Sequence, residues 1–161
     1  MDEAAVEALV KDGELLALLL VRNKSQHRRT DYFRALTGCV SALRRLHPAA
    51  LTELAQRVAL AESGSASTNG GDSWNARDEK KSELKKGVAV TITGVDGALV
   101  AATDLARHLR RTTRLLRQQV SAGYFLALTV AWLAIIARLL AAARAVALCL
   151  LSLRRSLAMV V

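Results

Sequence analysis

The residues best suited to chemistry lie in one polar run, RNKSQHRR, which follows the apolar run LLALLLV. Asn23 and His27, at positions i and i+4 of a helix, share one face, where an amide and an imidazole can hold a nucleobase or hydrogen-bond a neighbouring helix. Tyr32 adds an aromatic ring able to stack on an unpaired base. The residues expected to contact nucleic acid here are Arg22, Asn23, Lys24, Gln26, His27, Arg28, Arg29 and Tyr32.

A second basic set lies in DLARHLRRTTRLLRQQV, which runs from Asp104 to Val120. Its arginines recur at helical spacing on one face, and leucines line the other. Solvated faces usually mix the two signs of charge, whereas arginines alone repel one another until a polyanion neutralises them. The arginines expected to contact phosphate are Arg107, Arg110, Arg111, Arg114 and Arg117.

The charge of the whole chain points to the same class of partner. Among the 161 residues, 23 Lys and Arg outnumber 14 Asp and Glu, for a net charge of +9. After Asp104 there are nine arginines, no lysine and no further acid. Such a surplus favours nucleic acid or an anionic membrane surface.

The sequence shows no catalytic or metal-binding pattern. The three histidines share no metal-ligand spacing with acids or cysteines, and no nucleophile elbow, phosphate loop or acid pair is present. Cys39 and Cys149 form no CxxC pair and are expected to be small buried hydrophobic residues. The acidic N-terminus lacks the basic region of a secretory signal. We therefore expect a non-enzymatic intracellular protein with no cofactor and no metal.

The hydrophobic pattern predicts an all-α fold, a small helical bundle of about four helices with a long flexible loop between the first and second halves. Apolar residues recur at helical spacing from Leu15, so we expect a long helix from about Asp12 to Leu46, whose buried stripe the polar run interrupts. His47 precedes a proline, which ends that helix. Pro48 suits the first turn of a short helix to about Ala61.

The second half begins with a change of composition. SGSASTNGGDSWN and the charge cluster behind it predict a disordered insertion at 63–87. The β-branched residues and Val-Asp-Gly turn of 88–100 suggest a small hairpin. Helix resumes at Thr103 or Asp104, and 123–159 has the composition of a central bundle helix. Three small residues would let another helix approach it closely: Gly123, Ala127 and Ala131. The expected domain is a single helical one over 12–161.

A membrane-spanning helix is the principal alternative. The uncharged residues 118–137 would span about 30 Å as a helix, which is the thickness of a bilayer core. Arginines flank this stretch, but Arg138 and Arg144 interrupt the apolar run behind it. A helical adaptor that binds an acidic protein is a third possibility.

Two blocks of the sequence resemble one known family, the RNase MRP-specific protein subunits. RNKSQHRR, followed by Tyr32 and Phe33 and then by LRRL, is similar to the family's RNA-binding motif, an Arg-Asn-Lys-Asn-Gln-His-Arg run followed by an aromatic, usually Trp. Ser25 here replaces the second Asn, and Tyr32 replaces the Trp. GYFLALTVAWLAIIARL, 123–139, resembles the family's Gly-x-Phe and Leu-rich helix.

The resemblance implies a nuclear, chiefly nucleolar protein in a ribonucleoprotein whose RNA cleaves precursor ribosomal RNA in the first internal transcribed spacer. The expected partners are the RNase MRP RNA, other protein subunits of that particle and precursor rRNA, with no membrane. The subunit itself would bind RNA without catalysing its cleavage. Asn23, Gln26 and His27 would either contact RNA or hold helices together, and both roles are compatible with the sequence.

Overall fold

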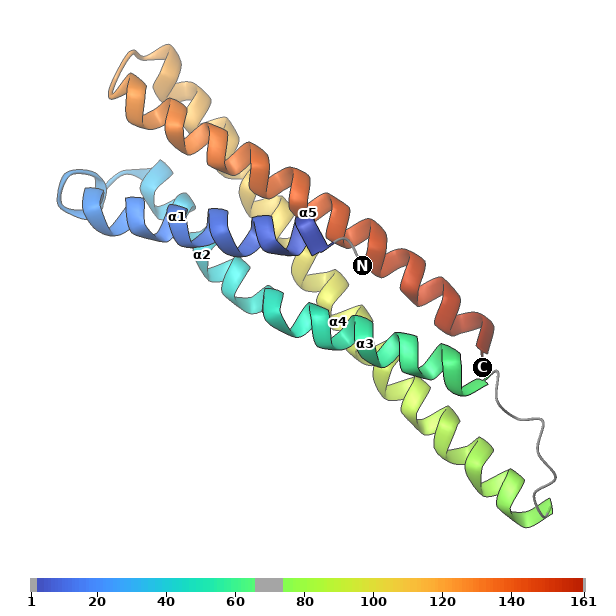
Figure 1. Ribbon diagram of the computed structural model, residues 1–161. Coiled ribbons are helices and arrows are strands. Elements are labelled where there is room, and N and C mark those ends of the chain that lie inside the picture. The colour runs from blue at the N-terminus through green and yellow to red at the C-terminus, as the bar shows by residue number, and fades with distance from the viewer. Residues whose placement is uncertain (1–2, 66–73, 161) are drawn as a thin grey trace.

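A computed structural model describes residues 3–65 and 74–160, and it is built of α-helices and short turns (Figure 1). The helices are α1 (Glu3–His27), α2 (Asp31–Leu46), α3 (Pro48–Ser65), α4 (Trp74–Ser121) and α5 (Leu126–Val160). No strand occurs in these two ranges. The predicted all-α bundle is confirmed, with the first expected helix divided into two.

The two longest helices, α4 with 48 residues and α5 with 35, run side by side along the molecule and are joined by a short turn (Figure 1). α1 and α2 form a second hairpin, in which α1 packs on α5 and α2 packs on α4. α3 contacts α1, α4 and α5. The turn between α1 and α2 and the turn between α4 and α5 therefore lie at the same end of the bundle (Figure 1).

The expected single helix to Leu46 is wrong because Thr30 starts a new one. The backbone of Thr30 is extended, and its Oγ1 accepts a hydrogen bond from the Phe33 N–H at 3.4 Å, as a helix N-cap does. The Thr30 N–H donates to the His27 carbonyl at 2.9 Å, which closes the turn behind α1. The chain thus reverses immediately after the polar run.

α1 also begins earlier than expected, at Glu3 instead of near Asp12. Ala5, Val6 and Leu9 are buried, so the first turns join the core and are held by packing. The end of α2 at Leu46 is as predicted, with His47 in the left-handed region at φ 46°. α3 then starts at Pro48, also as predicted.

The hairpin expected at 88–100 is wrong, since that segment lies within α4. Val88, Thr91, Val95 and Ala102 are buried and recur at helical spacing, so packing overrides the β propensity of the segment. α4 already begins at Trp74, so 74–87, expected to be disordered, is helical. Residues 66–73 of the expected insertion lie outside the described residues.

The core is aliphatic, with Trp132 as its largest fully buried side chain. Along α5, Ile136, Leu139, Val146 and Leu150 are at most 1 % exposed, as expected for a central helix. The expected small-residue groove is wrong: Gly123 lies in the turn before α5 at φ +73°, and Ala127 and Ala131 are exposed. Glycine occupies that position because it adopts a left-handed conformation without a Cβ penalty.

Two stretches, Lys86–Ser121 and Leu126–Met159, are long and apolar enough to cross a membrane by length and composition. The core helix of a soluble protein meets the same criterion. Two of the four arginines on α5 pair with acids of other helices: Arg138 Nε lies 3.0 Å from the buried Asp12 Oδ2, and Arg154 Nε lies 2.6 Å from Asp96 Oδ1. These pairs tie α5 to α1 and to α4.

Candidate nucleic-acid interface

The arginine stripe of α4 faces outward, as the sequence predicts. Arg107, Arg110, Arg111, Arg114 and Arg117 are all exposed. The opposite face of the same helix turns is fully buried, because Leu105, Leu109 and Leu116 are 0 % exposed and pack in the core. The hydrophobic side of α4 therefore fixes the direction in which the arginines project.

Most of this positive charge has no internal counter-ion. Arg107 Nη1 lies 2.6 Å from Asp104 Oδ1, and Arg45 Nη2 of α2 lies 3.7 Å from the other oxygen of the same carboxylate. Among the side chains that the structure describes, no carboxylate forms an ion pair with Arg110, Arg111, Arg114 or Arg117. Four guanidinium groups are thus left to attract an external anion.

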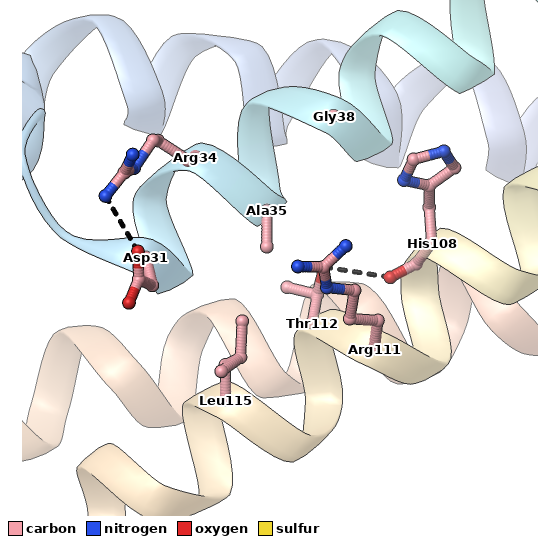
Figure 2. A pocket seen from close by; sticks show the side chains of 8 residues that line it. All are labelled: Asp31, Arg34, Ala35, Gly38, His108, Arg111, Thr112 and Leu115. Carbon is pink, nitrogen blue, oxygen red and sulfur yellow. Dashed lines mark hydrogen bonds and ion pairs between the residues drawn. The ribbon is translucent and has the colours of Figure 1, made fainter.

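A groove of about 400 Å³ runs between α2 and α4 beside this stripe (Figure 2). Figure 2 shows Arg34 on the α2 side and Arg111 on the α4 side. Arg34 pairs with Asp31 at 2.8 Å, whereas Arg111 has no such partner among the described side chains. The groove is lined by Asp31, Arg34, Ala35, Gly38, His108, Arg111, Thr112 and Leu115.

A second depression of about 650 Å³ adjoins the groove at Arg111. Its lining is Thr103, Arg107, Arg110, Arg111 and Arg114. Because Arg111 belongs to both hollows, the groove and the stripe form one cationic surface, which we call the α2–α4 face.

Two contacts hold α2 against α4 at this face, one of them buried. Cys39 Sγ lies 3.1 Å from Thr112 Oγ1, and burial raises the pKa of the Cys39 thiol to about 11, against the lowering effect of that hydrogen bond. Gly38 lies against His108, and a Cβ at Gly38 would meet His108 Nδ1 at 3.4 Å, an ordinary van der Waals distance. The close approach of the two helices sets the width of the groove.

The RNKSQHRR run divides into an outer and an inner set. Its outer set is exposed at the end of α1 and in the following turn, and it is compatible with the predicted phosphate contacts. These side chains are Arg22, Lys24, Gln26, Arg28 and Arg29. Asn23 is half-buried, and its Nδ2 donates to the Leu19 carbonyl one turn earlier at 2.8 Å. The amide is thereby engaged within α1.

The inner set is His27 with Tyr32, which are 1 % and 6 % exposed. The Tyr32 hydroxyl lies 2.6 Å from His27 Nδ1. The imidazole meets the rings of Phe125 and Trp132 edge-on, at centroid distances of 4.7 and 5.7 Å. The expected stacking of a base on Tyr32 is wrong, because its ring is buried and has no face free for a base. Of the two roles left open for His27, contact with RNA or holding helices together, the buried position fits the second.

Sequence reasoning missed Arg34 and His108 as lining residues of the groove. Arg34 follows the N-terminal turn of α2, and its place beside Arg111 depends on α2 packing against α4 with Gly38 opposite His108. The only signal in the sequence is Gly38 itself, a residue of low helix propensity inside a predicted helix. Among the described residues, no group of three or more His, Cys, Asp or Glu side chains could hold a metal ion.

Comparison with known proteins adds no relative: no protein-family model, no curated protein and no solved structure matches the chain.

Proposed function

We propose that this protein is an RNA-binding, non-catalytic subunit of the RNase MRP ribonucleoprotein, acting in the processing of precursor ribosomal RNA. The observation that carries RNA binding is the row of five exposed α4 arginines, of which all but Arg107 have no carboxylate partner among the described side chains. Arg107 and Arg117 are ten residues apart in the sequence, which corresponds to about 15 Å along the helix. A row of that length can contact several phosphates of one RNA strand.

Arginine side chains favour a partner that carries phosphate groups over a neutral or apolar partner. A guanidinium offers a planar fork of donors that binds phosphate with two hydrogen bonds. Contact with phosphates releases counter-ions, so a face with a surplus of positive charge gains free energy from RNA that it cannot gain from a neutral protein surface. The exposed arginines and lysine at the end of α1 add to the same field.

Assignment to the RNase MRP particle rests on the RNKSQHRR block and the 123–139 block. The two blocks meet where the α1–α2 turn lies against the α4–α5 turn. There the rings of His27 and Phe125 are in contact, with their centroids 4.7 Å apart. Two segments far apart in sequence thus build one end of the molecule. That arrangement is consistent with the two blocks acting together as one part of the molecule, as the resemblance implies.

The test is to recover the tagged protein from cells and to quantify the RNAs bound to it. RNase MRP RNA should be enriched, with RNase P RNA much less so, and the purified protein alone should cleave no RNA. Recovery of the two RNAs in equal amounts would remove the particle-specific assignment. Recovery of neither, with the protein retained in membranes after carbonate extraction, would favour the membrane alternative. The turn between α4 and α5 divides the span expected at 118–137, so the crossing helices would then be the apolar stretches of α4 and α5.

A further inference from the structure

The turn between α4 and α5 presents two aromatic rings to solvent. Tyr124 is 64 % exposed and Phe125 is 58 % exposed. The other aromatic side chains that the structure describes, Tyr32, Phe33 and Trp132, are at most 7 % exposed. Among the aromatic side chains whose exposure the structure describes, the open ones are therefore at this one turn, and burial in the core does not explain their position there.

Phe125 is held in a defined position in spite of its exposure. Its backbone lies in the left-handed region at φ 49°, which side chains other than glycine rarely adopt. The Thr129 N–H and Oγ1 both donate to the Phe125 carbonyl at 3.0 Å, and His27 meets the Phe125 ring edge-on at 89°. The ring is thus fixed from below while part of its surface stays open.

Cations outnumber acids near this turn, where the exposed Asp31 at the start of α2 is paired with Arg34 at 2.8 Å. Arg28 and Arg29 directly follow His27, which contacts Phe125, and Arg117 lies in the last turns of α4. All three are exposed. No acid occurs between Leu15 and Thr30 or anywhere after Asp104. Open aromatic rings among cations fit an unpaired nucleotide, whose base can stack while its phosphates are neutralised.

We propose that Tyr124 and Phe125 form a stacking platform for unpaired bases of single-stranded RNA, with Arg28, Arg29 and Arg117 on the adjoining phosphates. This inference rests on the proposed RNA-binding function and specifies the form of RNA recognised at this end of the molecule. Bases within a duplex are already stacked on their neighbours, so the platform discriminates against paired RNA. It performs the stacking that the sequence pattern assigned to Tyr32.

The test uses the full chain, an oligouridylate and a fully paired RNA duplex of the same length. Tyr124→Ala and the double variant with Phe125→Ala should bind the oligouridylate about 5- to 100-fold more weakly, the range expected for lost base stacking. Duplex affinity should stay nearly unchanged. The slope of log K against log salt should also stay unchanged, because no charge is removed. Tyr124→Phe should retain wild-type affinity for the oligouridylate.

Leu148→Ala is the matched control, because Leu148 is 68 % exposed, close to the exposure of Tyr124, but lies on α5 far from the turn. Tyr124→Ala removes a side chain that is mostly in solvent, and a thermal melt should show it folded. Equal oligouridylate affinity of Tyr124→Ala and wild type would overturn the platform while leaving RNA binding by the arginines intact. Failure of the wild type to bind either RNA would remove the proposed function as well. Binding to anionic phosphatidylserine vesicles that requires Tyr124, with oligouridylate unable to compete, would assign the turn to a membrane and overturn the proposal.

Discussion

Replacing Tyr32 by Phe removes one hydroxyl from a buried contact with His27. The hydroxyl lies 2.6 Å from His27 Nδ1, and His27 Nε2 already lacks a hydrogen-bond partner among the described residues. The variant therefore leaves both ring nitrogens of a histidine that is 1 % exposed without protein partners. An unsatisfied buried group of this kind costs about 1 to 3 kcal/mol. For a chain of this size the melting temperature should fall by about 2 to 12 °C.

The free energy of unfolding is measured by urea titration followed by circular dichroism at helical wavelengths. A double-mutant cycle compares wild type with Tyr32→Phe, His27→Ala and the double variant. Its coupling energy should be about 1 to 2 kcal/mol if the two side chains form one buried pair. At a temperature where all variants are folded, their RNA affinity should equal that of wild type. Arg28→Gln is the opposite control: it should weaken RNA binding and change stability by less than about 0.5 kcal/mol.

The opposite pattern of effects on stability and RNA affinity would refute the assignment of His27 and Tyr32 to the core. If Tyr32→Phe kept the stability of wild type and lost RNA affinity, the ring would face RNA in solution, and the division of RNKSQHRR into outer and inner sets would be wrong.

Three further predictions concern the packing of the bundle. Burial raises the pKa of the Cys39 thiol to about 11 from 9.0, so its contribution to stability is complete below pH 9 and is lost as pH rises through 11. Between pH 9 and pH 11 the free energy of unfolding of wild type should fall by about 2 kcal/mol relative to that of Cys39→Ala, as measured by urea titration. Arg138→Gln leaves the Asp12 carboxylate without its cation at 3.0 Å and should lower the free energy of unfolding by about 1 to 2 kcal/mol, with partial recovery on adding Asp12→Asn. Gly13→Val should cost about 1 to 3 kcal/mol, since a Cβ there overlaps a core leucine, whereas Gly97→Ala, with open space beside it, should raise the melting temperature.

Helix periodicity made the fold class and the arginine stripe predictable. The leucines of α4 recur at the spacing of one buried face, which places the arginines outside without further information. Pro48 likewise set the boundary between α2 and α3. In each case the signal depends on residues close together in the chain, so local sequence is sufficient.

The remaining features depend on contacts between distant segments. Residues 88–100 have a strand-like composition, but Val88 and Val95 reach the core only when α4 packs against other helices. The inward direction of His27 depends on Phe125 and Trp132, about a hundred residues later in the chain. The groove beside Arg111 exists because α2 packs on α4. None of these partners can be chosen from local spacing alone.

The measurement that tests RNA binding by the α4 arginines most directly is the salt dependence of RNA affinity. If about six phosphates are engaged, log K should fall with log salt at a slope of about −4 to −5, from 0.7 to 0.9 ions released per contact. Replacing Arg110, Arg111 and Arg114 together by Gln should flatten that slope by about two to three, with the helical content unchanged. An unchanged slope in the triple variant would contradict the account and show that the α4 arginines do not contact RNA.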